Sequence, residues 1–418
     1  MENSDINQKW DCTKEEWNSW RWQLENSITT VEELEKRFEI SDTQLTKIKQ
    51  AAEVFPMSIT PYYASLIDFD DQFCPIKQQA VPTQSELQDS AYEMDDPLHE
   101  EEDSPVDGLT HRYPDRVLLL VTNECSMFCR HCTRKRKVGD NQETVDIEQI
   151  RKGIEYIKQT PQIRDVLLSG GDPLLISNDT LEEIITELYA IEHIEIVRIG
   201  SRVPVVLPQR INDSLVEMLK RLNKEVGPVW INTHFNHSKE FTSASKQALN
   251  DLADAGVPLG NQTVLLQNVN DCPEVIKELM HDLVRYRVRP YYMYQCDLSR
   301  GIEHFRTTVS KGIEIMEHLI GHTSGFAVPR YVVDAPGGGG KIPLTPNYLL
   351  SSSNRKTILR NFEGTTTVYT EPKNQSTTCN LCDNHNSEHE VGLQKLLSEN
   401  NDKISLQSEE RDYANEKN

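Results

Sequence analysis

Six short apolar segments alternate with six amphipathic segments between residues 117 and 320, and this alternation limits the chain to few folds. The apolar segments have the length of buried strands, whereas the segments between them repeat apolar residues at helical spacing. The expected strands lie in the runs VLLLVT at 117, DVLLSGG at 165, IEIVRIGS at 194, VWINTHF at 229, QTVLL at 262 and RPYYMY at 289. The expected helices are Ile147–Lys158, Thr180–Ile191, Asp213–Leu222, Ser243–Ala255, Pro273–Tyr286 and Ser310–Ile320.

Successive β-α units predict a parallel sheet, which is either doubly wound or curved into a barrel. No G-x-G-x-x-G follows the first strand, which argues against the doubly wound dinucleotide fold. We therefore expect an α/β fold, an open (β/α)6 partial TIM barrel. Reactive residues of such barrels gather at the C-terminal ends of the strands. Here those ends carry a cysteine-rich loop and the polar residues Ser169, Asp172, Ser201, Arg202, His234, Gln262 and Asp297.

Three further regions are expected outside the barrel, which should span residues 111–345. Residues 1–110 predict a helical accessory region with amphipathic segments at Glu15–Thr29, Val31–Phe38 and Ser41–Val54. This region ends in an acidic, proline-punctuated connector, Asp95–Gly108. Residues 346–390 form a C-terminal segment, and the polar tail 391–418 is expected to be disordered.

The charge balance excludes some partners. With 66 acidic and 44 basic residues the net charge is −22, so the surface repels nucleic acid and anionic lipid. The densest basic run, Arg130–Lys137, is expected to bind a small anionic group. The sequence has no apolar stretch of membrane-spanning length and no signal-peptide core at its N-terminus, which predicts a cytoplasmic protein. There its nine cysteines can stay reduced.

Cys125, Cys129 and Cys132 form a C-x3-C-x2-C run directly after the first expected strand. Three thiolates at this spacing can hold three irons of a [4Fe–4S] cluster and leave the fourth iron open for chemistry, whereas electron-transfer ferredoxins supply four. A zinc site is the alternative, although structural zinc usually takes two separated cysteine pairs. The motif predicts an iron–sulfur centre with a reactive iron.

The second informative motif is DAPGGGGK, which ends at Lys341. It is not a Walker A phosphate loop, because that motif needs glycine at Ala335 and Ser or Thr at Ile342. Consecutive glycines let the backbone approach a bound group closely and leave the following lysine free to move. A lysine so placed can bind pyridoxal phosphate (PLP) covalently. A surface loop ending in a solvated lysine is the alternative.

Taken together, these motifs resemble those of the lysine 2,3-aminomutase family within the radical S-adenosylmethionine (SAM) superfamily. The resemblance extends from about residue 17 to about residue 382. It is carried by the segments LTHRYPDRVLLLVT, CSMFCRHCTRKR, DVLLSGGDPLL, EIVRIGSRVPVVLPQRI, NTHFNH, AGVPLGNQ, RPYYMYQCDLSRGIEHFRT and VVDAPGGGGK.

Membership would imply a 2,3-amino migration that interconverts L-lysine and L-β-lysine. The open iron would bind SAM and cleave it to a 5′-deoxyadenosyl radical, and PLP would stabilise the migrating radical. An external one-electron reductant, of flavodoxin or ferredoxin type, would be required. The resemblance also implies a homo-oligomer.

The resemblance assigns roles to residues that match the family's motifs. Arg134 would hold the substrate carboxylate through its guanidinium fork. Asp297 and Asp334 would hold the distal ammonium of lysine. The remaining ligand-binding residues would be Arg112, Tyr113, Arg116 and Lys341 for PLP, and Gly170, Gly171, Asp172 and Gln262 for SAM.

The two aspartates predict the substrate. Glutamate 2,3-aminomutase must hold a distal carboxylate, which Asp297 and Asp334 would repel, so lysine is the expected substrate. A relative that acts on lysine destined for a translation factor is an alternative within the class. A noncatalytic iron–sulfur redox protein is the alternative outside it.

The C-terminal cysteines depart from the family pattern. The family commonly holds a structural zinc with one barrel cysteine, matched by Cys272, and a C-terminal C-x-C-x2-C cluster. This chain offers only Cys379 and Cys382 there, and His385 or His389 would have to complete a tetrahedral site. Zinc is therefore an expectation from resemblance alone.

Overall fold

The computed structural model describes residues 10–88, 90–135, 145–353 and 355–372. Contacts between residues divide the chain into two units, 1–344 and 345–418.

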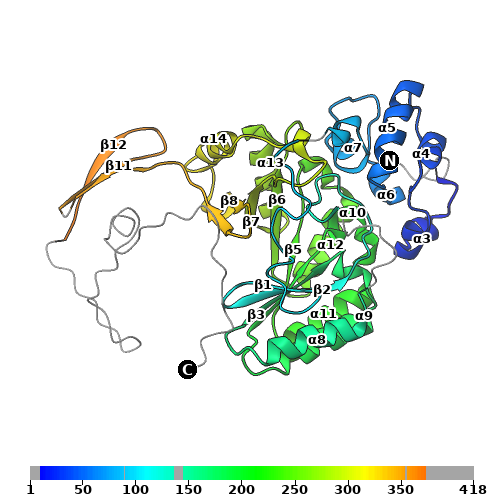
Figure 1. Ribbon diagram of the computed structural model, residues 1–418, viewed down its shortest axis with the longest axis horizontal. Coiled ribbons are helices and arrows are strands. Elements are labelled where there is room, and N and C mark those ends of the chain that lie inside the picture. Colours follow the sequence, from blue (N-terminus) through cyan, green and yellow to red (C-terminus); the bar gives the residue numbers. More distant parts are fainter. Residues whose placement is uncertain (1–9, 89, 136–144, 354, 373–418) are drawn as a thin grey trace. The chain divides into compact units, whose positions relative to one another are not determined.

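A nine-stranded sheet forms the centre of the first unit, and its strands lie in chain order (Figure 1). Neighbouring strands from β2 to β8 are all parallel, whereas β1 and β9 are antiparallel additions at the two edges. No pairing joins β1 to β9 in the described ranges, so the curved sheet stays open. The strands are β1 (Leu109–Tyr113), β2 (Arg116–Thr122), β3 (Asp165–Gly170), β4 (Ile196–Gly200), β5 (Val229–Thr233), β6 (Leu259–Leu265), β7 (Arg289–Gln295), β8 (Arg330–Ala335) and β9 (Gly340–Pro343).

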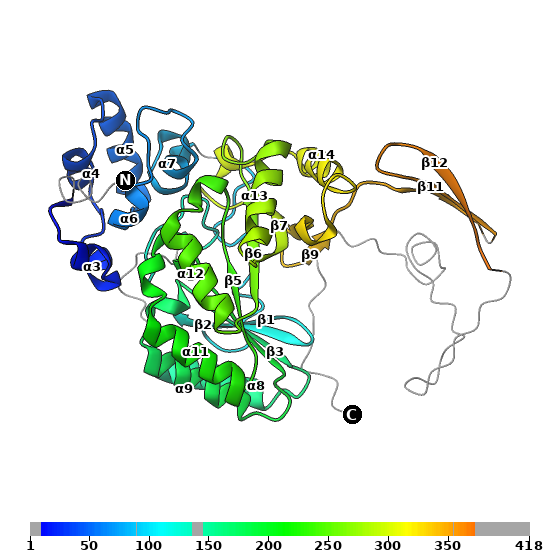
Figure 2. The same cartoon turned by 180° about the vertical axis from the view of Figure 1, so that it is seen from behind.

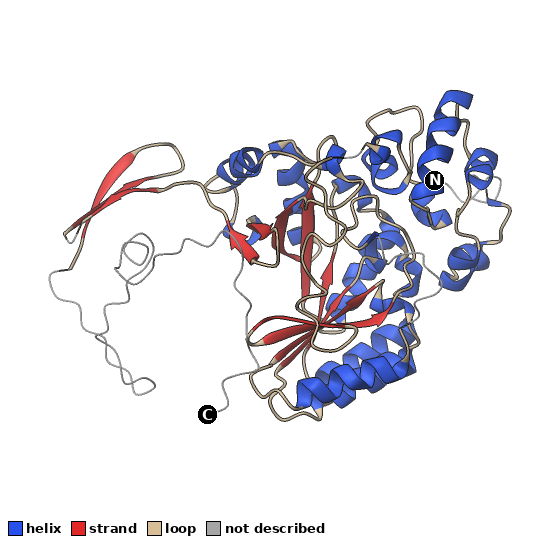
Figure 3. Cartoon of the chain, viewed as in Figure 1, coloured by secondary structure: helices blue, strands red, loops and turns tan. Residues whose placement is uncertain are grey.

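One long helix follows each strand from β2 to β7, and these helices lie along the outer face of the sheet (Figures 2 and 3). They are α8 (Ile147–Lys158), α9 (Asn178–Tyr189), α11 (Asp213–Glu225), α12 (Ser243–Asp254), α13 (Pro273–Arg285) and α14 (Val309–Leu319). Most of these helices follow a polar residue whose side chain accepts a hydrogen bond from a backbone N–H of the first turn, as Asp146 does for α8. The predicted partial TIM barrel is confirmed. Nowhere in the described ranges is a helix both long and apolar enough to cross a membrane.

The N-terminal residues form short helices that share the barrel's hydrophobic core. The predicted segment 15–29 is split into α2 (Lys14–Trp17) and α3 (Trp20–Glu25), because Ser19 caps a new helix. Tyr63 donates to buried Glu240 at 2.7 Å, and Thr60 donates to the carbonyl of Val206 at 2.6 Å. The other helices here are α4 (Val31–Arg37), α5 (Asp42–Val54), α6 (Pro61–Ala64) and α7 (Pro75–Ala80).

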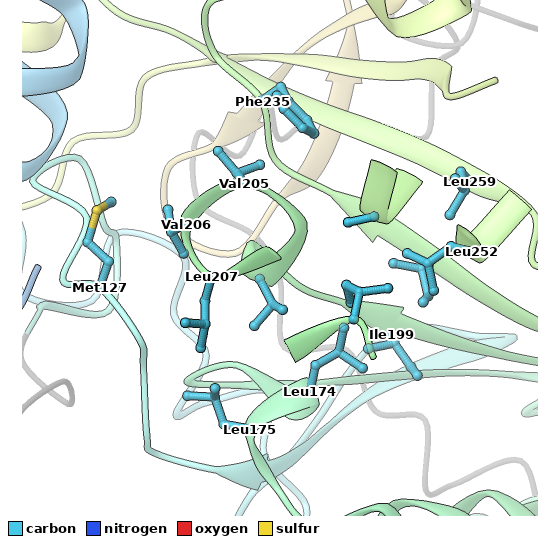
Figure 4. Close-up of a cluster of buried hydrophobic side chains, with 14 of the residues drawn as sticks. Met127, Leu174, Leu175, Ile199, Val205, Val206, Leu207, Phe235, Leu252 and Leu259 are labelled. Atoms are coloured by element: carbon cyan, nitrogen blue, oxygen red, sulfur yellow. The ribbon is translucent and has the colours of Figure 1, made fainter. Parts of the chain in front are cut away.

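Buried apolar side chains hold the loops that follow the strands. Figure 4 labels Met127 from the loop after β2, and Leu174 and Leu175 from the turn after β3. Val206 lies in the short helix α10 (Val203–Val206) after β4, and Phe235 follows β5. All five are at least nine-tenths buried. This packing fixes the polar residues at the C-terminal ends of the strands, because close-packed interiors leave side chains little freedom.

The described part of the second unit is a three-stranded antiparallel sheet. It consists of β10 (Leu349–Ser352), β11 (Lys356–Arg360) and β12 (Thr366–Thr370). Cys379 and Cys382, predicted as zinc ligands, lie outside the described residues, as does the predicted tail 391–418.

Candidate active site

A cavity of about 430 Å³ opens at the C-terminal ends of the barrel strands. It is lined by every residue predicted above to bind an iron–sulfur cluster, SAM, PLP or substrate. These are Arg112, Tyr113, Arg116, Cys125, Cys129, Cys132, Arg134, Gly170, Gly171, Asp172, Gln262, Asp297, Asp334 and Lys341. Cys272 lies elsewhere, exposed at the start of α13.

The three cysteines lie in the loop after β2. Burial, together with the neighbouring thiols, raises the pKa of Cys125 and of Cys132. The guanidinium of Arg202 donates to the sulfur of Cys129 at 2.8 Å. Within the described ranges no three His, Cys, Asp or Glu side chains lie close enough to share one metal ion. A four-iron cube needs no such convergence on one ion, because it takes each thiolate on a different iron.

The described cations of the basic run, Arg130, Arg134 and Lys135, form ion pairs within the protein, and the rest of the run lies outside the described residues. Arg130 donates to Glu86 at 2.5 Å, and both side chains are buried. Arg130 also donates to the carbonyl of Pro56 at 2.8 Å, and Lys135 contacts the same Glu86 at 2.9 Å. The expectation that this run binds a small anion is thus wrong for Arg130 and Lys135, because they compensate a buried carboxylate. Their ion pairs fasten the loop to the N-terminal helices instead.

The glycine-rich motif is the turn of a β-hairpin between β8 and β9. Gly337, Gly338 and Gly340 have φ values of +79°, +80° and +79°, which side-chain-bearing residues rarely adopt. Lys341 stands on β9 opposite Asp334, and its backbone N–H donates to the Tyr113 hydroxyl at 2.9 Å. The hairpin therefore fixes the backbone of Lys341 in a strand, and any freedom of this lysine lies in its side chain.

Two glycines bring β3 against the cysteine loop. A Cβ on Gly170 would lie 2.1 Å from the carbonyl oxygen of Thr122, and one on Gly171 would lie 2.0 Å from that of Glu124. The next residue, Asp172, accepts bonds from the Ser201 hydroxyl and from backbone N–H groups of the loop after β4. Burial raises the pKa of Asp172 to about 6. Because Gly170 and Gly171 have no side chains, their backbone atoms lie at the cavity wall.

The other side of the cavity holds two carboxyl groups and one ammonium. The Lys341 Nζ lies 3.4 Å from Oδ1 of Asp334. Burial and the nearby Asp334 raise the pKa of Asp297 to about 7, although Lys341 opposes the change. When Asp297 and Asp334 are both ionised, the single ammonium of Lys341 balances only one of their two negative charges. The arrangement favours a further cation.

The structure also places residues in the cavity that the sequence analysis did not assign to it. His131 and His234 approach each other at 3.3 Å between their Nε2 atoms. Burial lowers the pKa of both, in His234 to about 3, so the pair is neutral. Glu100, from the acidic connector, binds Arg134. His234 was marked only by its position at a strand end, and no local pattern singled out Glu100.

Comparison with known proteins identifies the family of this chain. Residues 119–281 match the model of the radical SAM superfamily, and residues 316–418 match one described as lysine-2,3-aminomutase. Fold and site thus define a radical SAM enzyme.

L-lysine 2,3-aminomutase of Clostridium subterminale is 57% identical over 94% of this chain and 95% of its own length. That of Fusobacterium nucleatum is 59% identical over 87% and 85%. Glutamate 2,3-aminomutase of Clostridioides difficile is 46% identical over 84% and 82%. The chain belongs to the lysine 2,3-aminomutase family and is an isomerase.

Proposed function

We propose that the protein interconverts L-lysine and L-β-lysine with a [4Fe–4S] cluster, SAM and PLP. The observation that carries the proposal is the pair of carboxyl groups, Asp297 and Asp334, in the same cavity as the arginine Arg134. Lysine has a carboxylate at one end and an ammonium at the other, and this distribution of charge is complementary to it.

The cysteine loop would hold the cluster through Cys125, Cys129 and Cys132. SAM would lie against Gly170, Gly171, Asp172 and Gln262, where the backbone is exposed to the cavity because β3 and the cysteine loop meet without side chains. Bound together, cluster and SAM supply the radical that removes hydrogen from the substrate.

PLP would be held covalently by Lys341 beside Tyr113, with Arg112 and Arg116 on its phosphate. The fit is supported by Gly340, where a Cβ would lie 3.1 Å from the Tyr113 hydroxyl and narrow the site. The Arg116 guanidinium stacks on the Tyr113 ring at 3.9 Å and is thereby kept at the cavity wall.

The substrate's ends would be recognised by opposite charges. Arg134 would bind the carboxylate, while Asp297 and Asp334 would bind the distal ammonium. Glutamate would place its second carboxylate against these two acids. Burial, and then the charge of Asp334, already raise the pKa of Asp297, so a third carboxylate would add to the repulsion. Lysine is therefore preferred.

We extend the proposal to zinc and to partners. The zinc proposal rests on the family resemblance alone and names Cys272, which is exposed at the start of α13, with Cys379 and Cys382, which lie outside the described residues. Elemental analysis showing no zinc in fully active protein would contradict this site. We also propose that the protein requires an external one-electron reductant and forms a homo-oligomer, because the resemblance to the family implies both.

The function is tested by anaerobic turnover of the iron-reconstituted protein with SAM, PLP and a strong reductant. L-lysine and L-glutamate are offered separately, and the products are identified by NMR. β-Lysine alone supports the proposal. β-Glutamate would refute the role of the two aspartates, and neither product despite an intact cluster would refute the free amino acid as substrate.

A further inference from the structure

The acidic connector between the N-terminal helices and β1 is attached to the barrel at both ends. The backbone N–H of Met94 donates to the carbonyl of Leu298 at 2.7 Å, directly after Asp297. At the other end, the N–H of His111 in β1 donates to the carbonyl of Asp103 at 2.8 Å. Two acidic side chains of this segment, Glu100 and Asp103, bind arginines of the cavity.

Glu100 holds one edge of the Arg134 guanidinium. Its two carboxylate oxygens accept from Nε at 2.9 Å and from Nη2 at 2.6 Å, while Nη1 donates to the Ser169 hydroxyl at 3.3 Å. A guanidinium has five N–H groups. Among the described residues these bonds use three, which leaves one N–H on each terminal nitrogen to donate to a bound carboxylate.

Asp103 holds the second arginine by the same edge. Its carboxylate accepts from Nε of Arg112 at 2.6 Å, and the carbonyl of Leu98 accepts from Nη2. The Arg112 side chain is only 9% exposed, so it has little room to choose another orientation. Both arginines are thus oriented by one segment, each through a different carboxylate.

We propose that Glu100 and Asp103 are positioning residues: Glu100 aligns Arg134 for the substrate carboxylate, and Asp103 aligns Arg112 for the cofactor phosphate. This inference rests on the proposed function, because it takes the two ligand groups from it. The connector is then part of the cavity wall, and it supplies one carboxylate to orient the arginine that binds each ligand.

The test compares Glu100→Gln and Asp103→Asn with the control Glu102→Gln, whose side chain is 75% exposed in the same segment. Each change removes one negative charge and keeps the size of the side chain. The KM for L-lysine is measured at saturating PLP, and the Kd for PLP is measured by absorbance titration of the ligand-free protein, without turnover.

Glu100→Gln should raise the KM for lysine roughly tenfold with kcat and the PLP Kd nearly unchanged, because the amide keeps one acceptor oxygen for the two N–H groups that the carboxylate binds. Asp103→Asn should instead raise the Kd for PLP by about the same factor and leave the KM for lysine unchanged at saturating PLP. Glu100→Asp, which keeps the charge, should recover part of the loss. The control should change neither constant.

Two results would overturn the inference. Equal changes of both constants in both variants would mean that the segment acts only through overall folding. A lower KM in Glu100→Gln would mean that Glu100 competes with the substrate for Arg134 and does not align it. Failure of the proposed function is distinguishable, because the unaltered protein would then form no β-lysine while the PLP titration would still test Asp103.

Discussion

The raised pKa of Asp297 predicts how the preference for lysine depends on pH. Burial and Asp334 raise this pKa to about 7, so the carboxyl is half protonated near neutral pH. An ammonium is bound by the ionised carboxylate and not by the neutral acid. We therefore expect kcat/KM for L-lysine to increase with pH until Asp297 is fully ionised, and Asp297→Asn to remove this dependence.

The size of the effect follows from the titration. With a pKa of about 7, about one-tenth of the molecules carry ionised Asp297 at about pH 6 and about nine-tenths at about pH 8. The expected increase in kcat/KM over these two pH units is therefore about tenfold, with a plateau above about pH 8.

The same shift affects stability with a definite sign. The folded state holds the Asp297 proton more tightly than the unfolded chain, whose carboxyl has the ordinary value of 3.8, so stability is lost as pH rises from about 4 to about 7. A pKa shift of this size corresponds to about 4 kcal/mol of lost stability. This value is an upper limit, because the side chain is only partly buried and faces the cavity. Asp297→Asn should therefore stabilise the ligand-free protein at neutral pH.

The assay measures β-lysine formation anaerobically from pH 6 to 8.5, with saturating SAM and PLP, for the unaltered protein and for Asp297→Asn. Urea unfolding of both proteins at pH 5 and pH 8 measures the stability difference. A flat kcat/KM profile in the unaltered protein, or the same slope in Asp297→Asn, would refute the reasoning. So would an asparagine variant that is less stable at pH 8.

Three further predictions concern residues that line the cavity or hold its cysteine loop in place. Gly171→Ala should lower bound iron and SAM affinity, because its Cβ would meet the Glu124 carbonyl at 2.0 Å; the control Gly325→Ala, with open space around it, should have no effect. Lys341→Ala should abolish the borohydride-reducible attachment of PLP, measured by mass spectrometry, whereas Lys311→Ala should retain it. Glu86→Gln should cost about 3–5 kcal/mol in urea unfolding, because it leaves Arg130 and Lys135 without their buried carboxylate, compared with under about 0.5 kcal/mol for exposed Glu314→Gln.

Most of the barrel was predictable from local patterns. The helix predicted at Ile147–Lys158 has those bounds in the structure, and Pro273–Tyr286 differs from α13 by one residue. Apolar residues at helical spacing with a polar residue before them define such helices wherever they pack. The split of segment 15–29 was missed, because the capping role of Ser19 depends on a local turn that the apolar pattern does not reveal.

The candidate site was predictable in its membership but not in its contacts. The spacing of Cys125, Cys129 and Cys132 and the glycines before Lys341 are local signals with a chemical reason. In contrast, the interpretation of Arg130 and Lys135 as an anion site was wrong, because their partner Glu86 lies 44 and 49 residues away. The sequence shows which side chains carry a charge, but it does not show which distant residue forms an ion pair with each of them.

The sequence by itself determined the periods of the strands and helices, the spacing of the three cysteines and the glycine turn, because each depends on residues close along the chain. Only the tertiary structure decided that Glu100 and Asp103 orient two arginines, that Asp334 faces Lys341, and that Asp297 titrates near neutrality. The physical reason is that ion pairing and pKa depend on distance and burial, which are set only when the fold brings distant segments together around one cavity.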